Sequence, residues 1–242
     1  MSLIKLNAID STNDYLKQLS KTSAIENFTI VMADEQTHGK GQMGSKWISE
    51  PGKNLTMSIL VTNFNLKNHT IFDLNVVTAV SILKVLQSCT IEHCTIKWPN
   101  DIMADSKKLG GILIENSLKS DGSVSAVIGI GLNLNQTNFE QLPQATSLFC
   151  VSGATYSPEN IALLLKNSLQ KYLQIMAKNQ DVVWDEYHQN LFKIQIPSAF
   201  EDNTGKQFMG IIQKVTRDGK LEVRLEDDTT THFNVKDVKM LY

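Results

Sequence analysis

The feature that most restricts the fold is a glycine-rich loop with the spacing G-x-G-x-x-G, which follows a predicted strand over residues 26–34. Its glycines are Gly39, Gly41 and Gly44. In a dinucleotide-binding fold this loop must open a helix, because the helix N-terminus binds the pyrophosphate. Here Pro51 and Gly52 prevent a helix, and residues 54–61 form the next predicted strand. The sequence therefore argues against a Rossmann fold.

Hydrophobic periodicity predicts a chain with both strands and helices. Runs rich in β-branched and aromatic residues predict strands over residues 26–34, 54–61, 94–98, 101–105, 108–118 and 123–135. Apolar residues at helical spacing predict helices over residues 71–89, 158–178 and 181–192. A hydroxyl side chain in the segment Ser11-Thr12-Asn13 is expected to cap a short helix over residues 14–20.

A change of pattern near residues 193–196 predicts a second domain. Beyond this point, short alternating runs are separated by Asp-Gly and Asp-Asp turns, which is typical of a small all-β unit. We therefore expect one domain over residues 1–193 and a β domain over residues 194–242.

Composition and charge favour a cytoplasmic protein without nucleic-acid or membrane partners. The chain has 242 residues, of which 42% are hydrophobic, and its net charge of −2 gives no broad basic surface for nucleic acid. Asp10 and Asp14 interrupt the first segment, which therefore does not resemble a signal peptide, and we expect no apolar run to approach the length of a membrane span. The cysteines predict no disulfide framework; they are Cys89, Cys94 and Cys150.

Several further residues suit the binding of an anionic ligand. The segment IKWPNDIMADSKKLGGIL, residues 96–113, places lysines and an Asn-Asp pair around a turn and a hairpin. Gly129 and Gly131 lie inside a predicted strand, where glycine often marks the close approach of a ligand or another backbone. Trp47 offers a flat face for a ring. Each feature also has a simpler interpretation, namely a surface turn, a β-bulge or a core tryptophan.

Taken in order, these segments resemble the biotin protein ligase family. STN at 11–13 is followed by QTHGKGQMGSKW at 36–47, KWPNDI at 97–102, KLGGIL at 108–113 and GIGLNLN at 129–135. The resemblance covers nearly the whole chain, and KWPND followed by KLGGIL is its most specific part. It implies an α+β fold, with a class II synthetase-like catalytic domain in which helices pack against a mixed or antiparallel sheet, and a small SH3-like β-barrel. It also implies a monofunctional ligase, without the N-terminal DNA-binding domain of some members.

The resemblance implies roles for particular residues. The expected biotin-binding set is Ser11, Thr12, Asn13, Gln36, Gly39, Lys40, Lys108, Gly111 and Gly129. The expected ATP- or adenylate-binding set is Lys40, Gly41, Gln42, Trp47, Asn54, Lys97, Asn100 and Asn133. Lys97, Lys108 and Asp101 are the expected catalytic residues, and Asp101 is also the expected ligand of Mg²⁺.

The implied reaction explains these residue types. Biotin is activated by ATP as biotinyl-5′-AMP and then passes to a lysine of a biotin carboxyl carrier domain of a carboxylase. Two anions must meet in the first step, so fixed cations such as Lys97, Lys108 and Mg²⁺ are needed to stabilise the developing charge. The sequence does not identify the base that deprotonates the acceptor amine, for which Asp101 is a candidate.

The chain departs from the family pattern at Gln42, where the commonest residue is arginine. An uncharged amide binds phosphate less strongly than a charged donor does, so we hypothesise that Lys40, Lys46 and Lys53 compensate. Two alternative functions stay open, a lipoate or octanoate protein ligase and a non-catalytic biotin-binding regulator. The sequence is compatible with a monomer or a homodimer.

Overall fold

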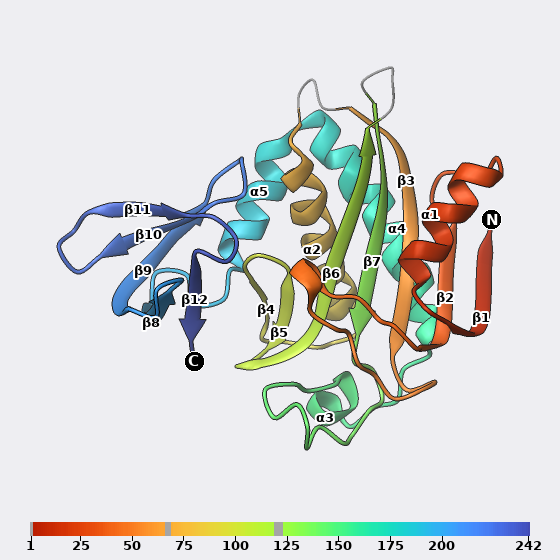
Figure 1. The fold of residues 1–242 in the computed structure, drawn as a ribbon, viewed down its shortest axis with the longest axis horizontal. Helices are drawn as coiled ribbons and strands as arrows, with labels where there is room; N and C mark the ends of the chain where they lie inside the picture. The colour runs from red at the N-terminus through yellow and green to blue at the C-terminus, as the bar shows by residue number, and fades with distance from the viewer. Residues whose placement is uncertain (1, 66–68, 119–122) are drawn as a thin grey trace.

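The computed structural model describes residues 2–65, 69–118 and 123–242, and its larger unit is a seven-stranded sheet (Figure 1). The strands lie in the order β1-β2-β3-β7-β6-β5-β4. Their bounds are β1 Leu3–Ile9, β2 Ile30–Gln36, β3 Leu55–Asn65, β4 Cys94–Lys97, β5 Asp101–Ala104, β6 Lys107–Leu118 and β7 Ser123–Leu132. The pair β1–β2 is parallel and the other neighbouring pairs are antiparallel. The predicted α+β class with a mixed sheet is confirmed.

Strand β1 lies outside the predicted strands. It forms an edge of the sheet and pairs with β2 alone, so its side chains are half-exposed or exposed. Its sequence does alternate, because Lys5 and Asn7 separate the apolar Ile4, Leu6 and Ala8, and Ile4 and Leu6 pack partly buried beside α1. This local pattern could have identified the strand.

Helices cover the two faces of the large sheet unequally (Figure 1). The helices α2 Ile71–Ser88, α4 Pro158–Lys178 and α5 Gln180–Gln189 form the main core on one face. Helix α1, Thr12–Thr22, packs on the other face, and Ser11 is its N-cap, as predicted. The short elements α3, Leu148–Ser152, and η1, Gln42–Gly44, lie in connecting segments.

Helix α2 is apolar and long enough to cross a membrane by length and composition, which corrects the expectation that no run reaches this length. However, 72% of the helix is buried inside the protein. A capping box fixes its first turn, because the Thr70 hydroxyl accepts from the Asp73 N–H and the Asp73 carboxylate accepts from the Thr70 N–H. These features are those of the core helix of a globular domain.

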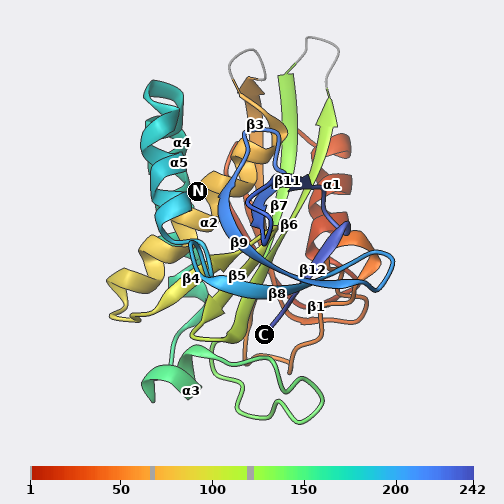
Figure 2. The ribbon, with the colours of Figure 1, turned by 90° about the vertical axis from the view of Figure 1, so that its left-hand side faces the viewer.

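The C-terminal unit is a second sheet of five antiparallel strands in the order β11-β10-β9-β8-β12. Their bounds are β8 Pro197–Asp202, β9 Gln207–Val215, β10 Leu221–Leu225, β11 Thr230–Phe233 and β12 Val238–Leu241. Within the fully described residues 194–242 no pairing joins β11 to β12, so the sheet is open and the expectation of a closed β-barrel is corrected. It lies beside β4 and β5 (Figures 1 and 2), and its buried residues Phe200 and Val223 belong to the main core.

Two glycines of β7 leave space on the face of the large sheet that carries α1. Successive strand residues point to opposite faces, and Ile128 and Ile130 enter the main core. Gly129 and Gly131 therefore lie on the α1 face, where Val127 packs against that helix. Without side chains at these positions, other parts of the chain can approach the sheet closely.

Asn13 and Trp47 fill part of this space. A Cβ atom on Gly129 would lie 2.6 Å from Asn13 Oδ1, and a Cβ atom on Gly131 would lie 2.6 Å from the Trp47 ring. Gly111 of β6 is the direct partner of Gly131, but a Cβ atom there would meet no atom closer than 3.6 Å. Glycine is thus required by packing at 129 and 131, and space remains above Gly111.

We predict that Gly131→Ala displaces the Trp47 indole and lowers the free energy of unfolding by about 1–3 kcal/mol, because overpacking a rigid ring forces a rearrangement. Urea denaturation and a crystal structure of the variant measure both effects. Gly111→Ala is the matched control in the same pair of strands and should change the free energy of unfolding by less than about 1 kcal/mol. Equal losses in the two variants would contradict this explanation of Gly131.

Candidate active site

The α1 face of the large sheet holds a pocket of about 420 Å³. The start of α1, the glycine loop, β3, β6, β7 and the turn before β5 contribute to its walls. Most of the predicted site residues line it, namely Ser11, Thr12, Asn13, Gln36, Lys40, Gly41, Gln42, Trp47, Asn100, Asp101, Lys108, Gly111 and Gly129. The fold therefore gathers segments that are far apart in the sequence around one cavity.

Uncharged polar side chains form the part of the pocket next to α1. Gln36 Oε1 accepts hydrogen bonds from the backbone N–H of Thr12 at 2.8 Å and from its hydroxyl at 3.0 Å. Ser58 Oγ lies 2.7 Å from Thr12 Oγ1 and 2.6 Å from Asn13 Oδ1. Because Gln36 Oε1 is occupied by Thr12, its Nε2 is the part of this amide that remains to donate to a ligand.

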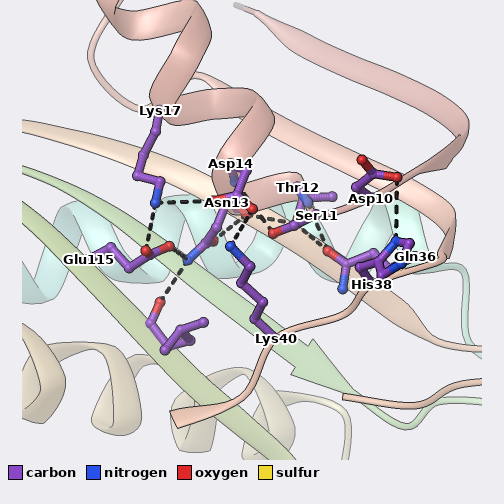
Figure 3. Close-up of polar contacts among 12 residues, drawn as sticks. Asp10, Ser11, Thr12, Asn13, Asp14, Lys17, Gln36, His38, Lys40 and Glu115 are labelled. Carbon is purple, nitrogen blue, oxygen red and sulfur yellow. Dashed lines mark hydrogen bonds and ion pairs between the residues drawn. The ribbon is translucent and has the colours of Figure 1, made fainter. Parts of the chain in front are cut away.

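A chain of ion pairs links this part of the pocket to the glycine loop (Figure 3). Asn13 Nδ2 donates to Glu115 Oε2 at 2.8 Å, and Glu115 Oε1 lies 2.6 Å from Lys17 Nζ. Asp14 pairs with Lys17 at 3.1 Å and with Lys40 at 2.5 Å. Burial alone would raise the pKa of Asp14, but hydrogen bonds from Lys40 and Lys17 hold this pKa below its ordinary value. Asp14 therefore stays ionised at neutral pH and retains Lys40 beside α1.

The glycine loop is a tight hairpin at the mouth of the pocket. Lys40 and Lys46 face each other in an isolated antiparallel bridge, and the Gly41 N–H donates to the Ser45 carbonyl at 2.7 Å. The turn between them includes Met43 with a φ of 57°. The N–H groups of Gly41 and Ser45 are bonded within the loop and do not face an anion in this conformation.

Gln42, the position where the resemblance leads one to expect arginine, lies in the pocket wall. Of the three lysines expected to compensate for it, Lys40 and Lys46 line the same pocket, whereas Lys53 does not. Lys40 is already paired with Asp14. Lys46 is the other lysine of this loop that lines the pocket. Among the residues that the structure describes, no carboxylate pairs with it.

The indole of Trp47 lies over Gly131 and lines the pocket. Its Nε1–H is buried and has no acceptor within the described parts of the chain. A buried donor without a partner is costly, so a ligand that places an acceptor there would remove this cost. The side chain therefore offers a ligand both a flat face and a hydrogen-bond donor.

A lysine–carboxylate pair marks the part of the pocket nearest β5. Lys108 Nζ lies 2.6 Å from Asp101 Oδ1. Asn100 Nδ2 donates to the Ile112 carbonyl at 2.8 Å, which fixes the turn before Asp101. Asp101 lies directly opposite Gly111, so the pair stands above the space that this glycine leaves. The arrangement provides one fixed cation and one carboxylate beside the same cavity.

Asp101 is also the one carboxylate among the described residues that line this pocket. No cluster of three or more His, Cys, Asp or Glu side chains suited to a metal occurs within residues 2–65, 69–118 and 123–242. Mg²⁺ at nucleotide sites is typically held by one or two carboxylates together with substrate phosphates. A single carboxylate therefore fits a cation that arrives with a nucleotide.

Lys97 lies outside this pocket, although its side chain shares a face of the sheet with that of its partner Asp101. Lys97 Nζ donates to the Tyr242 hydroxyl at 3.3 Å and lies 4.4 Å from the centroid of the Tyr242 ring. It borders a smaller pocket of about 160 Å³ against the C-terminal sheet. Burial lowers the pKa of Lys97, and the carboxylate of Asp101 partly opposes this shift.

Three other predicted residues also lie outside the larger pocket. Gly39 is at the base of the glycine loop, and Asn54 and Asn133 are buried. Asn54 Oδ1 accepts from the Leu134 N–H at 3.0 Å, and Asn133 Nδ2 donates to the Thr146 carbonyl at 3.0 Å. In this conformation the two amides hold the segment that follows β7.

Other pocket residues are absent from the predicted set. They are Met43, Ser45, Lys46, Thr56, Met57, Pro99, Ile112, Leu113, Ile130, Gly131, Val235 and Lys236. Thr56 and Leu113 could have been found from the strand register, because each is paired with one of the β7 glycines. Val235 and Lys236 come from the C-terminal unit, and no local sequence signal connects them with the site.

The sequence is similar to those of known ligases. It is 34% identical over 193 residues to the bifunctional ligase/repressor BirA of Bacillus subtilis (strain 168), an alignment that covers 76% of this chain and 59% of that protein. It is 26% identical over 215 residues to the biotin–[acetyl-CoA-carboxylase] ligase of Mycobacterium tuberculosis, covering 87% of this chain and 79% of that protein. The chain thus spans 59% of the length of the Bacillus relative.

The fold is similar to that of a solved structure, the biotin protein ligase from Aquifex aeolicus in complex with biotin and ATP. The TM-score is 0.81 at 23% sequence identity, over 99% of this chain and 98% of that chain. At this identity the likeness establishes the fold alone. The biotin/lipoate A/B protein ligase family matches residues 6–133, more than half of the sequence and nearly all of the pocket-forming segments. The chain therefore belongs to the biotin/lipoate A/B protein ligase family.

Proposed function

We propose that this protein is a biotin protein ligase that activates biotin with ATP as biotinyl-5′-AMP and transfers the biotinyl group to a lysine of a biotin carboxyl carrier domain. The observation that carries the proposal is one pocket that joins an uncharged polar part, an indole face and a lysine–carboxylate pair. These three parts suit a neutral ring with polar atoms, an adenine and reacting phosphates, respectively.

The polar part of the pocket favours biotin over lipoate. The fused ring of biotin contains a urea group with two N–H donors and a carbonyl acceptor, whereas the dithiolane ring of lipoate has no hydrogen-bond donor. Ser11, Thr12 and the free Nε2 of Gln36 would bind the urea group. A lipoyl ring would leave these polar groups without partners, at a cost of about 1–3 kcal/mol for each buried group.

Trp47 and the Lys108–Asp101 pair would bind the nucleotide. The indole face suits stacking of adenine, and its unpaired Nε1–H would donate to an acceptor of the adenylate. Lys108 would offset the repulsion between the biotin carboxylate and the α-phosphate. Asp101 would hold Mg²⁺, which neutralises phosphate charge when bound.

In the first step the protein positions the two reactants, and the reaction needs no nucleophile from the protein. A carboxylate oxygen of biotin attacks the α-phosphorus of ATP, the bond from that phosphorus to the bridging oxygen breaks, and pyrophosphate leaves with the electron pair. In the second step, the acceptor amine attacks the acyl carbon and AMP leaves. Asp101, as the pocket carboxylate, is our candidate for accepting the proton that the amine loses.

We further propose that residues 1–193 form the catalytic domain and residues 194–242 the C-terminal β domain of a cytoplasmic enzyme. The change from the mixed sheet to the open antiparallel sheet near this boundary supports the division. The acceptor would be the carrier domain of a carboxylase, since the named relatives include a biotin–[acetyl-CoA-carboxylase] ligase.

The test of the function is the exchange of radiolabelled pyrophosphate into ATP. We expect exchange that depends on biotin and that lipoate and octanoate do not support. Lys108→Gln should slow it by about 10²–10³-fold, as expected for loss of a group that stabilises transition-state charge. Exchange with lipoate but not biotin would identify a lipoate ligase, and biotin binding without any exchange would identify a regulator.

A second prediction concerns the charge of Lys97. Because burial lowers its pKa below the ordinary value of 10.5, the charge of Lys97 is lost as the pH rises through this lowered pKa. Arginine stays protonated throughout this range. If the charge supports adenylation, wild-type exchange should decline at alkaline pH, and Lys97→Arg should move that decline to higher pH.

The measurement is kcat/KM for exchange as a function of pH. The exposed Lys171 of α4 supplies the control variant, Lys171→Arg, whose profile should match that of the wild type. If kcat/KM declined at the same alkaline pH in Lys97→Arg and in the wild type, loss of the Lys97 charge would not be the cause of the decline.

A third prediction concerns Gln42. If the missing charge weakens the hold of the loop on biotinyl-5′-AMP, Gln42→Arg should slow release of the adenylate during turnover by about tenfold, the effect of one charge-assisted hydrogen bond. The release rate can be measured by trapping free adenylate with hydroxylamine. Unchanged retention would show that Lys40 and Lys46 already supply enough charge.

A further inference from the structure

The C-terminal unit contributes directly to the wall of the proposed active site. Val235 and Lys236 follow β11, and both line the larger pocket. Lys236 and Pro99 line the larger and the smaller pocket alike, so they mark the junction between the two. This junction lies at the end of the site where Asn100 and Asp101 are found.

The backbone holds Lys236 in a turn between β11 and β12. The Asp237 carboxylate accepts from the backbone N–H and the side-chain amide of Asn234, each at 2.8 Å, and the Asp237 N–H donates to the Asn234 carbonyl at 3.0 Å. Val235 and Val238 form an isolated bridge across the turn. Lys236 itself has a φ of 77°, a conformation that costs free energy for a residue with a side chain. The turn therefore fixes the direction in which this lysine leaves the backbone.

Lys236 is an uncompensated positive charge, in contrast to Lys108 and Lys97, which both have partners. Lys108 is paired with Asp101, and Lys97 Nζ rests on Tyr242. By contrast, Lys236 forms no ion pair or hydrogen bond with any residue that the structure describes, and its side chain is exposed. A free lysine beside the paired cations can receive an anion without first breaking an internal contact.

We propose that Lys236 binds the β- and γ-phosphates of the nucleotide, so that the C-terminal unit supplies a binding residue of the adenylating site. This proposal rests on the proposed function. The chemistry is consistent, because pyrophosphate carries most of the negative charge of ATP and must leave from the side of the site that faces away from biotin. The polar residues Thr12 and Gln36 occupy the α1 side of the pocket, and Lys236 occupies the side of Pro99 and Asp101.

The test compares ATP with AMP in the full chain carrying Lys236→Gln. Loss of one contact to the terminal phosphates should raise the KM for ATP in biotin-dependent exchange about tenfold. Isothermal titration calorimetry should show a similar loss of affinity for ATP and none for AMP, which lacks those phosphates. The KM for biotin should stay unchanged, and Lys236→Arg should restore the affinity for ATP.

Lys206→Gln is the matched control, because Lys206 is an exposed lysine of the same unit that lines neither pocket. Thermal unfolding of each variant confirms that the chain remains folded. An unchanged ATP affinity in Lys236→Gln, or an equal loss for ATP and AMP, would overturn the proposal. So would a change confined to the KM for the carrier domain, which would place Lys236 at the acceptor surface.

The same measurements separate this proposal from the proposed function. A wild-type chain without biotin-dependent exchange would refute the biotin ligase activity, whereas the calorimetric comparison of ATP with AMP would still decide the role of Lys236. Exchange by the wild type together with unaltered nucleotide binding by Lys236→Gln would leave the ligase activity in place and refute the role of Lys236 alone.

Discussion

The site depends on the absence of side chains from one face of the central sheet. Gly129, Gly131 and Gly111 lie in neighbouring strands on the face that carries α1, and the isoleucines beside them fill the core on the other face. A sheet built this way is well packed on one side and recessed on the other. Asn13 and Trp47 enter the recess, and the space they leave is the pocket.

Asn13 connects the floor of the pocket with the glycine loop at its mouth, and a ligand in the pocket would lie between these two parts. Its Oδ1 lies over Gly129, and its Nδ2 begins the series of contacts that passes through Glu115, Lys17 and Asp14 to Lys40. The glycine loop is therefore tied to α1 by charge, and α1 is tied to the sheet by packing. The conformation of the loop depends on residues that form the floor of the pocket.

The C-terminal unit is part of the construction of the site. It shares the main hydrophobic core, and the Trp98 indole N–H donates to its Gly219 carbonyl at 2.9 Å. Tyr242 holds Lys97, and Lys236 reaches the pocket wall. The segment that carries Lys97 and Asp101 is thus supported by the seven-stranded sheet on one side and by the C-terminal sheet on the other. A local change in this unit would be transmitted to the charged part of the pocket.

The sequence by itself determined the main helices and strands, because periodicity is a local property of the chain. Its motifs, through their resemblance to a known family, also indicated the fold class and about half of the residues around the pocket. Our sequence analysis missed edge strand β1, although Ile4, Leu6 and Ala8 alternate there with polar residues. Only the tertiary structure decided that Lys97 rests on Tyr242, that the amides of Asn54 and Asn133 bond within the protein, and that Lys236 joins the site. These facts depend on how the two sheets pack, and contacts between residues distant in sequence leave no periodic signal.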